Sequence, residues 1–229
     1  MRTSCKKRYK LSKSMSKLQT KMPTETWVAA TWDEYLEALE NPIYEKAKGY
    51  YYQQQLRIEM ESVGANHADN NGIVILLVNL WGIARGIPLK VLVNCSYRQQ
   101  GIKEAQPDIS YYIGDRVKYA PTGNKVVNLD NNQPPDLAIE IAVSSLIDDL
   151  GPKRMLYEDL GVAEYWVVDV EKAAITAFEI IANRGSKRID ESLVLPGLKM
   201  SLLTEALGRS CETNNTEVAS WFLAEVGKI

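Results

Sequence analysis

Histidine and cysteine are scarce in this chain of 229 residues. His67 is the single histidine, and Cys5, Cys95 and Cys211 are odd in number, far apart and without a Cys-x-x-Cys spacing. This composition argues against zinc hydrolases with several histidine ligands and against disulfide frameworks, and it limits a Ser-His-Asp scheme to one residue. The same cysteine pattern favours a reducing, cytoplasmic compartment.

The chain also lacks an excess of one charge and a long apolar run. Its formal net charge is −2, so a nucleic-acid-binding surface would need a local basic patch on a nearly neutral whole. The longest apolar run, Ile73 to Ala84, is interrupted by Asn79 and Gly82 and predicts a buried helix, not a membrane span. We therefore expect no membrane association.

One compact domain is expected over residues 25–209, because a chain with 45% hydrophobic residues can bury a single core. The head, residues 1–24, is rich in Lys and Arg and contains no acid before Glu25, which predicts a flexible basic segment. A basic arm that contacts DNA phosphates is the alternative for this head. Residues 210–229 are expected to form a tail that is polar at first and then amphipathic and helical.

Apolar periodicity predicts an α/β protein with a mixed sheet. Helices are expected over residues 31–41 (capped by Thr31), 67–85 (ended by Gly86), 148–160 (Asp148 and Asp149 in the first turn, Gly161 at the end) and from 202 to 209. Strands are expected over 50–62, 91–95, 109–113, 137–143, 165–168 and 174–181, with a turn-rich loop from Pro121 to Pro135. The strand–helix–strand order of residues 137–168 implies a right-handed parallel crossover.

Two acidic residues occupy positions where a charge is costly. Asp108 opens a predicted strand, and Glu140 lies inside the apolar run 137–143. A buried, unpaired carboxylate costs several kcal/mol and needs a cation, a proton or a donor. Neighbouring strands bring two such side chains to one ion, and an oxygen-rich site favours Mg²⁺ or Mn²⁺. A structural ion pair of Glu140 with Lys153 or Arg154 is the alternative.

Lys153 lies one turn into the helix that follows Glu140, where its ammonium can point back at the strand end. Its functional role would be to polarise a phosphate or the attacking water; the alternative is an ordinary solvated lysine. Auxiliary candidates are Glu59, on the polar strand face that also carries Arg57 and Glu61, and His67, Gln106 and Asp149. Each of three candidates also has a non-functional alternative. Glu59 would be exposed to solvent, His67 would lie in the interior or at a helix end, and Asp149 would be a first-turn helix acid.

These segments together resemble the Uma2 family, a group of restriction-endonuclease-like proteins abundant in cyanobacteria. The resemblance covers about residues 30–209 and rests on five runs: Gln106-Pro-Asp-Ile-Ser, Pro135-Asp-Leu-Ala-Ile-Glu-Ile-Ala-Val-Ser-Ser, Asp149-Leu-Gly-Pro-Lys-Arg-Met-Leu-Tyr, Leu160-Gly-Val-Ala-Glu-Tyr-Trp-Val-Val-Asp and Leu193-Val-Leu-Pro-Gly-Leu. It implies a PD-(D/E)xK nuclease with an αβββαβ core and a mixed sheet flanked by helices.

By this resemblance Asp108 is the motif aspartate and Glu140 the second acid, and both bind metal together with the backbone carbonyl of Ile141 or Ala142. The motif lysine is replaced by Ala142, and Lys153 from the next helix is its substitute. The resemblance thus implies an endonuclease that hydrolyses DNA with Mg²⁺ or Mn²⁺, with a homodimer as the expected assembly. Asp108→Ala is expected to abolish cleavage and to leave folding intact or improved, because it removes like-charge repulsion.

Two other function classes stay open. Ala142 at the lysine position and the balanced charge favour a catalytically inactive nuclease-fold protein that binds nucleic acid or a protein partner. An interaction protein that dimerises through the apolar helix from Ile73 to Ala84, or through exposed sheet edges, is the second.

Overall fold

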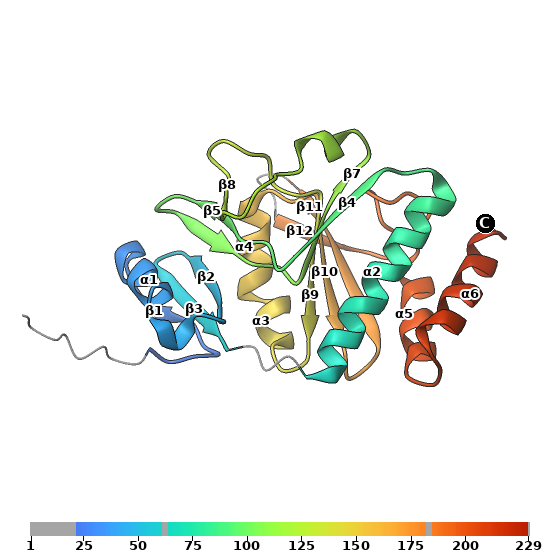
Figure 1. Ribbon diagram of the computed structural model, residues 1–229, viewed down its shortest axis with the longest axis horizontal. Coiled ribbons are helices and arrows are strands. Elements are labelled where there is room, and N and C mark those ends of the chain that lie inside the picture. Colours follow the sequence, from blue (N-terminus) through green and yellow to red (C-terminus); the bar gives the residue numbers. More distant parts are fainter. Residues whose placement is uncertain (1–21, 61–63, 182–184, 229) are drawn as a thin grey trace, which may run out of the picture.

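The computed structural model describes residues 22–60, 64–181 and 185–228. Two sheets lie side by side, with helices between them and on the far flank of the larger sheet (Figure 1). Most of the basic head, and Glu61 of the predicted strand 50–62, lie outside the described residues. None of the helices in the described ranges combines the length and the apolar character that crossing a membrane requires.

The larger sheet contains the strands of the expected αβββαβ core. Its strands are β4 (Leu89–Val93), β7 (Ile109–Ile113), β9 (Leu137–Ala142), β10 (Glu164–Asp169), β11 (Ala174–Ile181) and β12 (Gly185–Ile189). Their spatial order is β12-β11-β10-β9-β7-β4, and β9 and β10 are parallel while the other pairs are antiparallel. The predicted parallel crossover between the fourth and fifth expected strands is confirmed.

The smaller sheet was not expected from the sequence. Its strands are β1 (Val28–Ala29), β2 (Lys48–Tyr52), β3 (Gln55–Glu59), β5 (Tyr97–Gln99), β6 (Lys103–Ala105) and β8 (Val127–Asn128). Their order is β1-β3-β2-β6-β5-β8, with only β5 and β8 parallel. Several of these strands have two or three residues, too short for an alternating pattern to show, and β8 lies inside the predicted loop from Pro121 to Pro135.

Helices pack on both sheets, and the larger sheet is covered on both of its faces. They are α1 (Trp32–Leu39), α2 (Ala65–Arg85), α3 (Leu146–Leu150), α4 (Pro152–Leu160), α5 (Met200–Ser210) and α6 (Asn215–Val226), with 3-10 turns η1 (Pro42–Tyr44) and η2 (Gly114–Tyr119). The order α2, β4, β7, β9, α4, β10 reproduces the expected αβββαβ core, and the fold class is confirmed.

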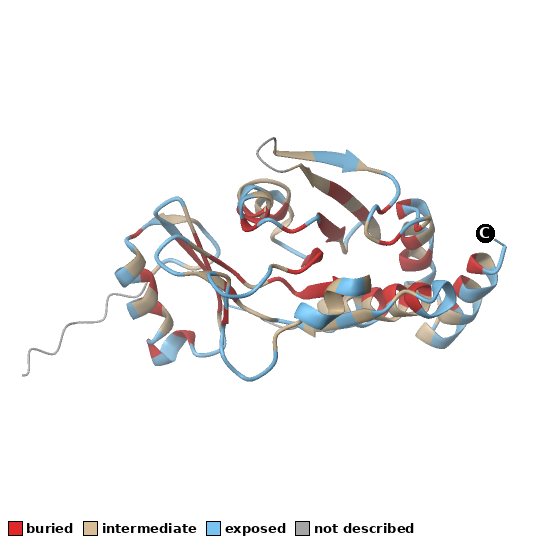
Figure 2. Ribbon diagram, turned by 90° about the horizontal axis from the view of Figure 1, so that it is seen from above, coloured by how far each residue is buried: buried red, intermediate tan, exposed pale blue. Residues whose placement is uncertain are grey.

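Three apolar clusters hold these layers together. One joins α2, α5 and α6 to one face of the larger sheet, a second joins α4 to its other face and to the smaller sheet, and a third packs α1 on β2 and β3. Figure 2 shows buried residues along the central strands and exposed residues on the outer faces of the helices. Because the second cluster binds the two sheets together, residues from both sheets can share one site.

The predicted single strand over 50–62 is wrong: residues 48–59 form a hairpin. β2 and β3 are antiparallel, with Lys48 opposite Glu59 and Tyr52 opposite Gln55. The turn residues Gln53 and Gln54 have φ of 48° and 58°, a left-handed pair that glycine and asparagine usually supply. Glutamine at both positions hides the turn from sequence analysis.

The predicted helix over 148–160 is two helices. Gly151, with φ −114° and ψ −105°, separates α3 from α4, and Pro152 opens α4 at a position where its missing N–H costs nothing. Asp148 and Asp149 therefore lie in the first turn of the short helix α3, as expected for helix acids, but that helix ends at Leu150. Both helices lie between the two sheets in Figure 1.

One face of the apolar helix α2 is buried in the core. Its residues Val74, Leu77 and Trp81 are fully buried, and α6 packs on it through Phe222. This face of α2 already contacts the larger sheet and α6, and the expected homodimer stays a prediction. The segment expected as a tail forms the helix α6 in this core.

Two glycines of α2 provide a matched pair for testing its packing. A methyl group on Gly82 would lie 2.4 Å from Cδ1 of Leu89 and 3.1 Å from the Ile87 carbonyl, whereas nothing lies within 4 Å of one on Gly72. We expect Gly82→Ala to lower the free energy of unfolding by about 1–3 kcal/mol. Gly72→Ala should raise it by about 0.5–1 kcal/mol through the unfolded chain's lost entropy. Urea denaturation of both variants checks this, and equal effects would contradict the close packing of α2 on β4.

Candidate active site

Asp108 and Glu140 share one face of the larger sheet. Ile109 and Ile139 pair across β7 and β9 and point into the core under α2, so their chain neighbours Asp108 and Glu140 point to the opposite face. Continuing this antiparallel register by one residue sets Asp108 opposite Glu140. Directly opposed side chains have Cβ atoms roughly 4.5–5.5 Å apart. The two predicted acids thus lie on adjacent strands and face the same way.

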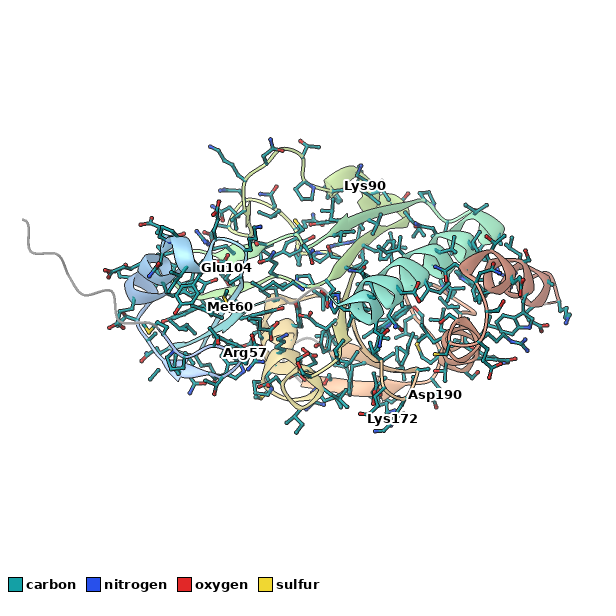
Figure 3. All side chains as sticks on the ribbon, turned by 60° about the horizontal axis from the view of Figure 1, so that its bottom comes forward. Arg57, Met60, Lys90, Glu104, Lys172 and Asp190 are labelled. Atoms are coloured by element: carbon teal, nitrogen blue, oxygen red, sulfur yellow. The ribbon has the colours of Figure 1, made fainter. Side chains whose placement is uncertain are left out.

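Both acids line a pocket of about 550 Å³ that opens to solvent. The rest of its charged lining comes from the segment before β1, from β2, β3, α2 and α4: Glu25, Lys48, Glu59, His67 and Lys153. Figure 3 labels Arg57 and Met60 at the edge of this region, beside the α3–α4 segment. The structure therefore brings the predicted residues Asp108, Glu140, Lys153, Glu59 and His67 to one pocket.

Asp108 is held by three donors. Lys48 Nζ forms a short ion pair with its Oδ1, His67 Nε2 lies 3.1 Å from the same oxygen, and the Ile141 N–H donates to Oδ2 at 2.7 Å. Burial alone would raise the pKa of Asp108, but the His67 hydrogen bond and the Lys48 charge outweigh it and lower the pKa. Asp108 is thus an ionised carboxylate although it is almost fully buried.

Glu140 is held by hydroxyl groups. Tyr157 donates to its Oε1 at 2.7 Å, and the Tyr50 hydroxyl lies 3.1 Å from the same atom. Burial raises the pKa of Glu140 well above its usual value; the Lys153 charge opposes this shift, and the Asp108 charge adds to it. The two acids therefore have opposite pKa shifts. Because the charged form of Glu140 is disfavoured by burial, a nearby cation would stabilise that form more than it would stabilise the already paired carboxylate of Asp108.

Lys153 is a buried cation among three carboxylates, not a solvated helix lysine. Its Nζ lies 2.8 Å from Glu59, 2.9 Å from Asp149 and 3.9 Å from Glu140, and the side chain is 1% exposed. Burial would lower its pKa, but these three charges outweigh burial and raise it. The structural ion pair of Glu140 with Lys153 therefore exists, whereas Arg154 lies beside Glu158 instead.

The predicted solvated face of strand 50–62 is wrong. Arg57 is 2% exposed and donates to Glu59 at 2.7 Å, and its other nitrogens lie 3.2 Å from Asp148 and 3.7 Å from Glu25. Charges from the two helices cover this face, since Asp148 of α3 pairs with Arg57 and Lys153 of α4 pairs with Glu59. The charges of Lys153 and Arg57 outweigh burial and lower the pKa of Glu59.

Two predicted residues do not contribute as expected. The Gln106 side chain donates to the Asn94 carbonyl at 3.2 Å and is not part of the pocket lining. The Ala142 carbonyl accepts the Val170 N–H at 3.1 Å on the β10 side of the strand. Ile141 N–H points to Asp108, and the N–H and C=O of one strand residue point the same way. The backbone carbonyl directed at the acids is therefore that of Ile141.

Sequence reasoning missed Lys48, Tyr50 and Tyr157. Lys48 and Tyr50 come from β2, which reaches the acids only through contact between the two sheets, and Tyr157 lies one turn after Lys153 on α4. A lysine before the aromatic run 50–52 was the one local signal for β2, and nothing in it indicates an ion pair with a residue 60 positions away.

The donor chemistry of this pocket fits a hard divalent cation. Two carboxylates and the Ile141 carbonyl are oxygen ligands of the kind that Mg²⁺ and Mn²⁺ prefer. In the described ranges, however, no group of three or more His, Cys, Asp or Glu side chains is arranged to hold a metal. Lys48 and Lys153 are the cations beside Asp108 and Glu140.

Because Lys48 forms an ion pair with Asp108, the expectation that Asp108→Ala leaves folding intact or improved has to be revised. Removing this carboxylate leaves the Lys48 ammonium, 4% exposed, without the charge that it faces. Loss of one partner from a buried pair costs about 3–5 kcal/mol, more than relief of repulsion between the two acids returns. Folding of that variant is therefore expected to be impaired, not intact or improved.

A mixed sheet with two acids on neighbouring strands above a solvent-accessible pocket defines a nuclease-like α/β protein. The profile of the Uma2 family, described as "putative restriction endonuclease", matches residues 32–212, and the chain belongs to this family. A crystal structure of a "putative nuclease belonging to DUF820" from Anabaena variabilis ATCC 29413 is similar with a TM-score of 0.51 and 17% identity. The similarity covers 84% of this chain and 98% of that chain, and it shows a shared fold. No curated protein matches.

Proposed function

We propose that this protein is a metal-dependent endonuclease that hydrolyses phosphodiester bonds of DNA. The observation that carries the proposal is the pairing of Asp108 and Glu140 across β7 and β9, on one sheet face, in a pocket open to solvent. A structural pair of acids would need no opening, and membership of a restriction-endonuclease family favours the catalytic interpretation.

Asp108, Glu140 and the Ile141 carbonyl would hold Mg²⁺ or Mn²⁺. The cation supplies Lewis-acid chemistry: it lowers the pKa of the attacking water and neutralises charge on the phosphate. Lys153 fixes the carboxylates of Glu59, Asp149 and Glu140 relative to one another. Lys153 thus has a positioning role, and it lies on the helix after the strand in which Ala142 replaces the motif lysine.

Hydroxyl groups hold the second acid. Tyr157 and Tyr50 restrict the rotation of Glu140, so its free oxygen needs little reorganisation on binding a cation. His67 is a neighbour of Asp108 from α2 and limits that side chain in the same way. Water activated by a bound cation needs no protein nucleophile.

The test is cleavage of supercoiled plasmid, linear duplex and single-stranded DNA by purified protein with Mg²⁺, Mn²⁺ or EDTA. We expect nicks or breaks with either metal and none with EDTA. The Asp108→Asn variant, after a check of its folding by circular dichroism, is the control for contaminating nucleases. Cleavage by that variant at the wild-type rate, or no cleavage of any of the three DNAs by the wild-type protein, would contradict the proposal.

A second candidate is a nuclease-fold protein that binds nucleic acid or a protein without cutting it. The observation that favours it is that protein groups already surround both acids, including a lysine at each. Calorimetric titration with Mn²⁺ separates the two candidates. Binding that disappears in Asp108→Asn supports the enzyme, and no binding by the folded wild-type protein supports the second candidate.

A further inference from the structure

The two lysines of the pocket differ in what they neutralise. Lys153 faces three carboxylates, and two of them, Glu59 and Asp149, are not expected metal ligands. Lys48 forms an ion pair with Asp108, which is the first expected ligand. A divalent cation at Asp108 therefore takes over the ion-pair partner of Lys48 and leaves the closest partners of Lys153 in place.

We infer that Lys48 and the divalent cation compete for Asp108, and that the displaced Lys48 ammonium binds the phosphate of the substrate. This inference rests on the proposed function. It assigns the phosphate-binding role to a residue of the β2–β3 hairpin, in place of Lys153.

Charge decides between the two lysines as phosphate ligands. A phosphate next to Lys153 would meet Glu59 and Asp149, which lie within 3 Å of its ammonium and are not expected to bind the cation. A phosphate next to Lys48 would meet Asp108, whose charge is neutralised once a cation is bound. Repulsion between like charges a few Å apart is large in a poorly solvated pocket, so the Lys48 side of the pocket is the more favourable place for an anion.

Position also favours Lys48. It is the first residue of β2, and it lines the same pocket as Asp108 and Glu140. Its charge also contributes to lowering the pKa of Glu140, so its ammonium lies within electrostatic reach of both acids. A small rotation of a four-carbon side chain is enough to carry its ammonium from a carboxylate oxygen to a phosphate oxygen bound beside it.

The experiment compares Lys48→Gln with the wild-type protein in two assays that should change in opposite directions. Calorimetry should show about tenfold tighter Mn²⁺ binding, because a close buried charge pair no longer competes for Asp108. Plasmid cleavage at saturating Mn²⁺ should slow by about a hundredfold, because one group that stabilises charge on the phosphate is lost. A purely structural lysine would weaken metal binding and cleavage together.

Two further variants sharpen this comparison. Lys48→Arg keeps the charge and should recover part of the cleavage rate. Lys103→Gln changes a partly buried lysine of the same sheet, which donates to the Asp159 carbonyl outside the pocket, and should change neither assay. Melting in EDTA and in Mn²⁺ completes the set: Lys48→Gln should be less stable than wild type in EDTA and should gain more from Mn²⁺.

These experiments separate failure of the inference about Lys48 from failure of the proposed endonuclease function. If the wild-type protein neither binds Mn²⁺ nor cuts DNA, the proposed function is wrong. If it does both, unchanged or weaker Mn²⁺ binding by Lys48→Gln overturns the competition, and an unchanged cleavage rate overturns the phosphate contact. A Lys48→Gln protein that stays unfolded in Mn²⁺ also contradicts the inference, because the cation should replace the missing ammonium.

Discussion

Glu140→Gln is expected to reduce metal-dependent DNA cleavage by about a thousandfold or more. The amide keeps the size of the side chain and one oxygen for the Tyr157 and Tyr50 hydroxyls, but it removes a negative charge beside the expected cation. Electrostatic stabilisation by a bound metal is worth several kcal/mol, which corresponds to this loss of rate. Initial rates of plasmid nicking in Mg²⁺, measured for both proteins, check the prediction.

Folding of Glu140→Gln should be preserved, with a free energy of unfolding within about 1 kcal/mol of wild type. Glu140 is fully buried and its pKa is raised, so its charge is a cost in the metal-free protein, and Lys153 keeps its closer partners Glu59 and Asp149. Glu205→Gln on the exposed side of α5 serves as the control and should leave cleavage unchanged. Retention of wild-type cleavage by folded Glu140→Gln would remove this residue from the active site.

Lys153→Met should destabilise the metal-free protein by about 3–5 kcal/mol at pH 8, because it leaves buried carboxylates without their cation. The methionine fills a similar volume, so the loss reflects charge and not a cavity. Glu59 and Asp149 lie within 3 Å of the ammonium that is removed, and Arg57 compensates Glu59 only. Urea denaturation in EDTA measures the effect.

The destabilisation should shrink as the pH falls from 8 to 5. Burial already raises the pKa values of Asp149 and Glu140 against the opposing charge of Lys153, so loss of Lys153 raises them further. A carboxyl whose folded pKa exceeds its unfolded value holds its proton in the folded state, and stability therefore increases as pH falls through the folded pKa. Lys90→Met on the exposed surface of β4 is the control and should change stability by less than about 0.5 kcal/mol at either pH. A pH-independent loss for Lys153→Met would show that charge is not its cause.

Elements with a strong local signal were predictable from sequence. The Thr31 capping box with Glu34 begins α1, and Gly86 with φ 65° ends α2, both at residues whose chemistry favours a helix end. The bounds predicted for β7 and β11 agree with the structure. The hairpin of β2 and β3 was missed because its turn is made by Gln53 and Gln54, and side-chain contacts elsewhere in the fold must compensate for their left-handed backbone.

The site residues also differ in whether the sequence near them indicates their role. Asp108 and Glu140 were found because an isolated acid in an apolar strand is anomalous within a few residues of sequence. Lys48, Tyr50 and Tyr157 carry no such local anomaly, since a lysine at a strand start and a tyrosine on a helix are ordinary. What makes them part of the site is contact between two sheets, which periodicity along one segment does not encode.

The long spacing between the paired charges has a consequence during synthesis of the chain. The Lys48–Asp108 ion pair joins residues 60 positions apart, and the contact from Tyr50 to Glu140 spans 90 positions. Contacts so distant along the chain form late in folding, after the intervening segments are made. A nascent or half-folded chain therefore has scattered acids, and the pocket around Asp108 and Glu140 is assembled only after the last of these partners has left the ribosome.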